Sequence, residues 1–148
     1  MRLEQSIQVD ASREDVWRVV SDPARYPDFM HGVTRWEHAG GRKTGAGARY
    51  SVRMHVGNAY VGGVIEIVEF NKPVELAWVS ITGIDQRGRW RLRERDQGGT
   101  DVTLRLIYDS PGGVIGQLAE FMSAPLVSGN LRATMQALKR LVQSSRQA

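Results

Sequence analysis

Apolar and polar residues alternate along most of the chain, a pattern typical of β-strands that bury one face. The first such stretch is residues 2–10, where Leu3, Ile7 and Val9 lie on one face. The alternation returns after residue 32 and predicts strands at 33–39, 47–56, 59–70, 74–82, 86–96 and 100–109. Short segments rich in glycine, asparagine and proline separate these strands, so consecutive strands are expected to pair antiparallel.

Helical signals follow the first strand. Ser12 precedes a run of charged residues with acids in the first turn, which predicts a helix N-cap. A second short helix is expected to begin at Asp22-Pro23, with aspartate as N-cap and proline at the first position. Pro27 disfavours the helical conformation at Tyr26, which limits this second helix to one or two turns.

The chain ends in a long amphipathic helix, predicted at 114–144. Its apolar stripe steps by four, three and four residues through Leu131, Met135, Leu138 and Val142. Pro125 lies inside this segment and is expected to kink the helix through a clash with the carbonyl of Phe121. The predicted fold is therefore α+β: a curved seven-stranded antiparallel sheet around a kinked C-terminal helix, with 1–148 forming a single domain.

One helix about 10 Å wide cannot fill the hollow of such a sheet, so large side chains or a cavity must occupy the remainder. The alternation and the helical stripe select candidate ligand-binding residues that face inward: Tyr50, Val52, Met54, Trp90, Leu92, Leu104, Tyr108, Leu118, Phe121 and Met122. Any one of these residues alone would fit an ordinary core. Strand 59–70 is apolar on both faces, so the pattern leaves open whether Glu66 points inward.

Composition and charge narrow the possible functions. The 148 residues include no cysteine, which excludes disulfides, thiolate nucleophiles and cysteine-ligated metals. Lys and Arg number 20 against 16 Asp and Glu, a net charge of +4. Five arginines alternate along one strand: Arg87, Arg89, Arg91, Arg93 and Arg95. They form either a basic patch or a solvated face with ion pairs, and nearby acids favour the second interpretation, so nucleic acid is not an expected partner.

Other chemical motifs are missing. The spacings of His31, His38 and His55 match no zinc motif, and no nucleophile elbow or phosphate-binding loop is found. We therefore expect no metal and no cofactor, and we expect His31 to lie where a loop could gate a pocket. No apolar run approaches the roughly 18 residues of a membrane span, and the N-terminus lacks a signal-peptide core. A cytoplasmic location is the resulting expectation.

Several segments resemble one family. They are Val16-Trp17-x-Val19-x-Ser21-Asp22-Pro23-x-x-Tyr26-Pro27-x-Phe29, Gly63-x-x-Glu66, Pro73-x-x-Leu76-x-Trp78, Gly88-x-Trp90-x-Leu92 and Gly99-Thr100-x-Val102-x-Leu104. Together they resemble the polyketide cyclase/dehydrase branch of the START-like, Bet v 1-like (SRPBCC) superfamily. The resemblance covers nearly the whole chain and implies the helix-grip fold with a hydrophobic tunnel. It supplies no catalytic motif, because these positions are architectural.

The favoured hypothesis is binding of a small hydrophobic ligand, such as a polyketide, lipid or isoprenoid. An alternative is a polyketide aromatase/cyclase, with Glu66 as general acid or base and Tyr50 or Tyr108 as hydrogen-bond donor to an enolate. A second alternative is an interaction module that uses the arginine strand. The sequence leaves open the ligand, the occurrence of catalysis, and a monomeric or homodimeric state.

Overall fold

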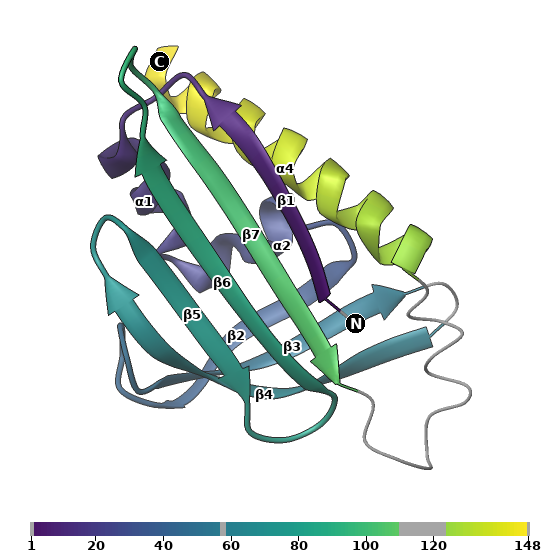
Figure 1. Ribbon diagram of the computed structural model, residues 1–148. Helices are drawn as coiled ribbons and strands as arrows, with labels where there is room; N and C mark the ends of the chain where they lie inside the picture. Colours follow the sequence, from purple (N-terminus) through teal and green to yellow (C-terminus); the bar gives the residue numbers. More distant parts are fainter. Residues whose placement is uncertain (1, 57–58, 110–123, 148) are drawn as a thin grey trace.

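Seven antiparallel strands form one strongly curved sheet (Figure 1). The structure is a computed structural model that describes residues 2–56, 59–109 and 124–147. The strands are β1 Arg2–Val9, β2 Val33–Gly41, β3 Ala48–Val56, β4 Ala59–Asn71, β5 Glu75–Ser80, β6 Asp85–Glu94 and β7 Thr100–Asp109. Their order across the sheet is β1-β7-β6-β5-β4-β3-β2. This confirms the predicted antiparallel meander, and the predicted strand boundaries agree to within about two residues.

The helical elements after β1 are α1 Arg13–Val20, the 3-10 turn η1 Pro23–Arg25, and α2 Tyr26–Phe29. The Ser12 side chain accepts a hydrogen bond from the Asp15 backbone N–H at 3.2 Å, as the capping signal predicts. Asp22 is the N-cap of η1 and Pro23 its first residue, as predicted, although the Asp22 side chain makes no capping hydrogen bond. The helical segment is also as short as predicted, but the expectation that Tyr26 avoids the helical conformation was wrong, because Tyr26 is helical. The hydroxyl of Tyr26 donates to the Val20 carbonyl at 2.6 Å, so buried tertiary contacts override the local effect of the following proline.

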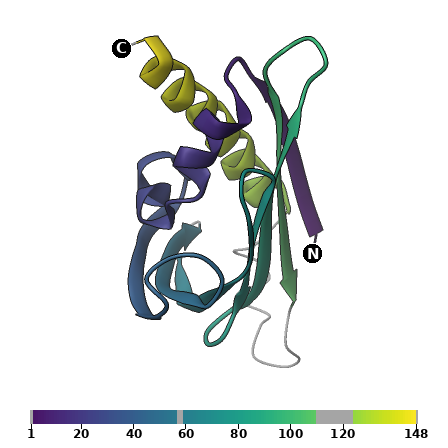
Figure 2. The ribbon, with the colours of Figure 1, turned by 90° about the vertical axis from the view of Figure 1, so that its left-hand side faces the viewer.

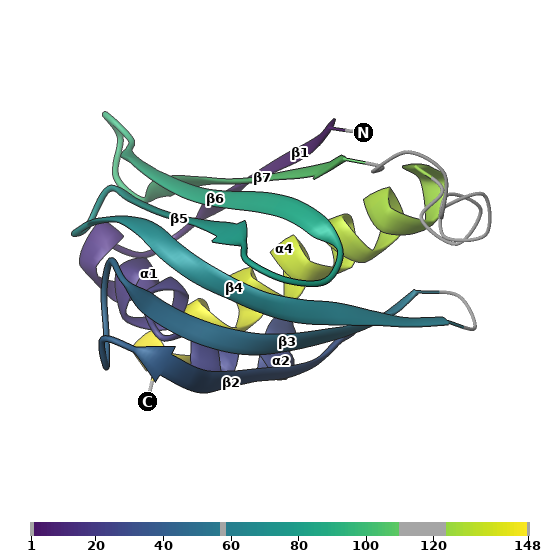
Figure 3. The ribbon, with the colours of Figure 1, turned by 90° about the horizontal axis from the view of Figure 1, so that it is seen from below.

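The long helix α4, Ala124–Gln147, lies against the concave face, and Figures 2 and 3 show it between the two halves of the curved sheet. All four residues of the predicted stripe are buried: Leu131, Met135, Leu138 and Val142. Pro125 is the second described residue of α4. The predicted helix start at 114 and the Phe121 carbonyl, which the expected kink involves, lie outside the described residues. Within the described part of the chain, no helix is both long and apolar enough to cross a membrane.

Strand β4 has one buried face, which the sequence left undecided. Ile65 and Ile67 are fully buried on the concave side, whereas Val68 is 42% exposed. A bulge shifts the pairing with β5 between Ile67 and Glu69. Phe70 then packs on the Trp17 ring at 5.1 Å. The bulge breaks the two-residue period, which explains why both faces of this strand look apolar in the sequence.

Aromatic rings fill one part of the concave face. The aromatic cluster consists of Tyr26, Phe29, Trp36, Trp78 and Trp90, all buried. Tyr26 lies at its centre, with ring centroids 4.8 Å from Trp36, 5.7 Å from Phe29, and 6.2 Å from both Trp78 and Trp90. Large side chains therefore fill part of the hollow, and the question becomes whether space remains elsewhere along the sheet.

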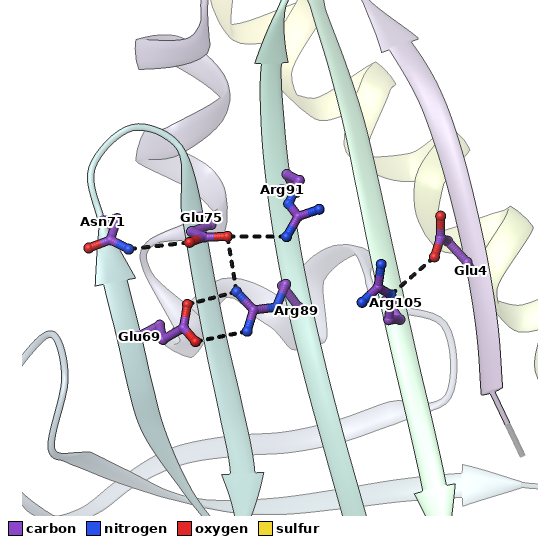
Figure 4. Close-up of polar contacts among 7 residues, drawn as sticks. All are labelled: Glu4, Glu69, Asn71, Glu75, Arg89, Arg91 and Arg105. Atoms are coloured by element: carbon purple, nitrogen blue, oxygen red, sulfur yellow. Dashed lines mark hydrogen bonds and ion pairs between the residues drawn. The ribbon is translucent and has the colours of Figure 1, made fainter.

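The convex face carries the arginine strand, and two of its arginines, Arg89 and Arg91, pair with acids of neighbouring strands (Figure 4). Arg89 donates to Glu69 at 2.7 Å and to Glu75 at 2.9 Å, and Arg91 lies 3.6 Å from Glu75. On β7, Arg105 donates to Glu4 of β1 at 3.1 Å. These ion pairs support the interpretation of the stripe as a solvated, internally paired face.

Candidate functional site

A small cavity remains between the concave face and the described N-terminal part of α4. Its volume is about 40 Å³, room for about one or two water molecules. It is lined by Met30, His31, Gly32, Val33, Met54, His55, Leu106, Tyr108, Asn130, Leu131 and Thr134. The lining combines apolar side chains with a few polar groups, which is the usual make-up of a small-molecule site.

The curvature of the sheet creates this cavity by bringing β3 and β7 together. Three strands separate β3 from β7 in the sheet order. The Tyr108 hydroxyl nevertheless reaches Met54 and donates to its Sδ at 3.9 Å. Burial raises the pKa of Tyr108 well above its usual value, so its hydroxyl stays neutral and can donate a hydrogen bond. The site thus contains a neutral donor within an apolar wall.

The loop between α2 and β2 closes another side of the cavity. The His31 backbone N–H donates to Thr134 Oγ1 of α4 at 2.9 Å, and the His55 N–H donates to the Gly32 carbonyl at 2.6 Å. Gly32 has a φ of +86°, and a Cβ there would lie 3.0 Å from the His55 oxygen and 3.2 Å from Asn130 Nδ2. Glycine therefore allows this loop to approach both β3 and α4 closely.

The structure brings together only part of the predicted ligand-binding set. Met54 and Tyr108 line the cavity. Five others are buried on the concave side but do not line it: Tyr50, Val52, Trp90, Leu92 and Leu104. Trp90 belongs to the aromatic cluster. Burial raises the pKa of Tyr50, whose ring packs edge-on against His38 at 5.7 Å. The remaining three, Leu118, Phe121 and Met122, lie outside the described residues.

Glu66 does not face the cavity, which corrects its candidacy as an internal acid or base. It is paired in register with Arg49 of β3, and its Oε1 accepts from Arg49 Nε at 2.9 Å. Its neighbours Ile65 and Ile67 are the buried residues, so alternation directs Glu66 to the convex face. A carboxylate that is paired with Arg49 on the convex face lies on the opposite side of the sheet from the cavity, so it cannot act on a ligand held there.

Several lining residues were not selected from the sequence, among them Val33, Asn130 and Thr134. A signal for two of them exists: Asn130 and Thr134 are one helical turn apart, beside the apolar stripe. His31 was expected near a pocket, and it does line the cavity. Among the described residues, no three His, Asp or Glu side chains gather as a metal site would require.

The curved sheet packed against a long helix is the helix-grip fold, which this chain shares with solved structures such as a START superfamily protein and Ara h 8.0201. The chain belongs to the family described as polyketide cyclase/dehydrase and lipid transport, whose model matches residues 1–143. This confirms the resemblance seen in the sequence. A search of curated proteins finds no significant match.

Three solved structures illustrate the shared fold. TTHA0849 from Thermus thermophilus has a TM-score of 0.81 at 19% identity, covering 98% of this chain and 99% of its own. The Zhui aromatase/cyclase from Streptomyces sp. R1128 has a TM-score of 0.78 at 17% identity, covering 97% and 93%. A START superfamily protein from Mycobacterium smegmatis has a TM-score of 0.76 at 15% identity, covering 97% of each chain. At these identities the likeness establishes the fold.

Proposed function

We propose that residues 1–148 form a single domain that binds a small hydrophobic molecule, such as a polyketide, lipid or isoprenoid, between the concave face and α4. The observation that carries the proposal is the cavity at the meeting point of β3, β7 and α4, with its apolar wall and few polar groups. The family's description, which includes lipid transport, supports the same function.

The cavity must widen to admit such a ligand, because drug-sized ligands occupy sites of about 300 Å³ or more. The Met54 side chain is the natural element to move, since methionine is unbranched and adapts to irregular spaces. Its hydrogen bond with Tyr108 is long, at 3.9 Å, and ends on a weak sulfur acceptor. Exchanging this contact for contacts with a ligand would therefore cost little.

Native mass spectrometry of the purified protein, together with displacement of the apolar dye anilinonaphthalene sulfonate, tests the binding function. The Leu106→Trp variant adds a large side chain to the cavity wall and should reduce dye binding at least about tenfold. The control is Ile107→Trp, at the next position of β7, where alternation points the side chain to the convex face. The proposal fails if wild-type protein binds neither the dye nor a co-purified ligand, or if both variants bind equally well.

An aromatase/cyclase is the second candidate, favoured by the neutral Tyr108 hydroxyl in the cavity wall. Such a group could donate a hydrogen bond to an enolate oxygen as negative charge develops there. Incubation with a poly-β-keto substrate tests this, and Tyr108→Phe should reduce turnover by roughly a hundredfold if the hydroxyl acts this way. Absence of turnover in the wild type, or equal turnover in the variant, would leave binding without catalysis.

A further inference from the structure

A second hollow lies at the end of β7 away from the apolar cavity. Tyr108, near the last residue of β7, lines the apolar cavity, whereas Gly99, just before β7 begins, lines this second hollow, the polar cleft. The polar cleft lies between the β6–β7 hairpin and the start of α1, which Figure 1 shows near each other. Its volume is about 550 Å³, a size typical of small-molecule sites. It is lined by Ala11, Ser12, Arg13, Glu94, Arg95, Asp96, Gly98 and Gly99.

Two arginines of the polar cleft have guanidinium groups that make no hydrogen bond within the described part of the chain. Arg13 lies 3.9 Å from Glu94, and Arg95 lies 3.6 Å from Asp101, both too far for a hydrogen bond. Arg13 Nε is buried and has no hydrogen-bond partner among the described residues. Arg89 on the convex face, by contrast, donates hydrogen bonds at 2.7 and 2.9 Å. The two cleft arginines therefore keep their donors for another partner.

The same two arginines are partly withdrawn from water. The side chain of Arg13 is 27% exposed and that of Arg95 is 30% exposed, whereas Glu94 is 72% exposed. Partly buried cations attract anions more strongly than solvated ones, because the local dielectric is lower and salt screens them less. Ser12 Oγ accepts from the Asp15 N–H, which leaves its own hydrogen free to donate. Donors from both sides of the cleft suit the three terminal oxygens of a phosphate monoester.

The polar cleft also contains two carboxylates, Glu94 and Asp96. They repel a bare anion, but they accept hydrogen bonds from hydroxyl groups, as acidic side chains do with ribose in dinucleotide sites. Gly98 and Gly99 have no side chains to fill the cleft beside them. A ligand with a phosphate at one end and hydroxyl groups along the rest therefore satisfies the arginines and the carboxylates together.

We propose that the polar cleft binds a phosphorylated polyhydroxy compound, such as a sugar phosphate. Arg13, Arg95 and Ser12 donate hydrogen bonds to the phosphate, and Glu94 and Asp96 accept them from the hydroxyl groups. This site is separate from the apolar cavity and goes beyond the proposed function, so each of the two can hold when the other fails.

Isothermal titration calorimetry at low ionic strength, with ribose 5-phosphate as the probe, tests this site. Wild-type protein should bind the probe with a Kd of about 1 mM or lower. Ribose and inorganic phosphate should each bind at least about tenfold more weakly, because each lacks one of the two recognised groups. Arg13→Met and Arg95→Met should each weaken binding of the probe by at least about tenfold. The matched control is Arg18→Met, which removes the same charge from α1 outside the cleft and should change the Kd by less than about twofold.

Amide NMR spectra of the wild-type protein locate the probe without relying on any variant. Ribose 5-phosphate should shift the N–H signals of Gly98 and Gly99 and leave that of Gly32, in the wall of the apolar cavity, unchanged. The inference is overturned if the probe does not bind, if ribose or inorganic phosphate binds as tightly, or if the signals of Gly98 and Gly99 stay in place. Folded Arg13→Met that binds the probe as tightly as wild type would also overturn it. None of these outcomes affects the apolar cavity, which dye binding tests separately.

Discussion

Gly88 on β6 shows how one residue without a side chain allows the aromatic cluster to form. It pairs directly with Trp78 of β5, and a Cβ at this position would overlap the Trp78 ring atoms Cζ2 and Cε2. The Trp78 indole therefore occupies the space that a side chain at position 88 would need, and it is only 1% exposed. The requirement here is for space and not for an unusual backbone conformation.

Gly88→Ala should accordingly lower the free energy of unfolding by about 1–3 kcal/mol, because the added methyl group forces the buried Trp78 ring to shift. Urea denaturation measures the loss. The opposite result is expected for Gly129→Ala in α4, where a Cβ meets nothing within 4 Å. Alanine there should stabilise the helix by roughly 0.5–1 kcal/mol. Equal effects of the two substitutions would contradict this account of Gly88.

Tyr108 should make the protein sensitive to alkali. Burial raises its pKa above the value of about 10 expected in the unfolded chain. Above pH 10 the unfolded state loses this proton while the folded state retains it. The free energy of unfolding is therefore unaffected by this group below pH 10 and decreases as the pH rises above 10. The slope for one such group is about 1.4 kcal/mol per pH unit. Tyr108→Phe should flatten the dependence of unfolding free energy on pH above 10, and an unchanged slope would argue against this shift.

At the scale of elements, the alternation of apolar and polar residues was sufficient to predict the strands, because most of them bury mainly one face. The faces of 47–56 and 100–109 were assigned correctly on that basis, since Met54 and Tyr108 are buried. Residues 59–70 could not be assigned, because the bulge after Ile67 changes the register and both faces carry apolar side chains. The sequence pattern therefore left Glu66 as a candidate internal acid, whereas the structure places its side chain beside Arg49.

Arg89 joins β6 to the strands beside it by bridging Glu69 and Glu75. Its hydrogen bond lowers the pKa of Glu69, so this carboxylate stabilises the fold above its unfolded pKa of about 4.3 and progressively less as pH falls below it. Arg89→Met should lower the free energy of unfolding by about 1 kcal/mol near neutral pH, and by less in 1 M salt. The loss should also be smaller at acidic pH, where Glu69 becomes protonated.

The control for Arg89→Met is Arg18→Met, which removes an exposed ion pair with Asp15. Because exposed pairs within one helix contribute little, this substitution should change the unfolding free energy by less than about 0.5 kcal/mol. Urea denaturation at two pH values and two salt concentrations provides both comparisons. If the two variants lose equal stability, the bridge across strands has no special role.

At the scale of the whole molecule, the cavity depends on the curvature of the sheet, which no local pattern encodes. The alternation identified Met54 and Tyr108 as inward-facing, but their contact requires strands with three others between them to curl toward each other. The aromatic cluster similarly depends on the position of α2 against the sheet. The alternation therefore identifies which strand faces point inward, but it does not locate the cavity that remains between them.

Ligand binding should stabilise the whole domain, because a ligand held between the sheet and α4 binds only the folded state. A small hydrophobic ligand, with methyl decyl ketone as the probe, should add about 2.7 kcal/mol to the unfolding free energy at a hundred times its Kd, which corresponds to a rise in Tm of roughly 5–10 °C. Differential scanning fluorimetry measures the shift. The Leu106→Trp variant should show little or no shift, and an equal shift in that variant would place the ligand elsewhere.

The pairing of β1 with β7 has a consequence for folding kinetics. Ser6 and Thr103, which lie 97 residues apart in the sequence, share a hydrogen bond between their hydroxyls across these strands at 2.8 Å. During synthesis β1 leaves the ribosome first, yet it has no partner in the sheet until β7 follows. Such distant contacts raise the contact order and slow folding, and unpaired strands expose edges that can aggregate. The arrangement that places β1 at the edge of the sheet beside β7 therefore leaves this early strand unprotected until the last strand has formed.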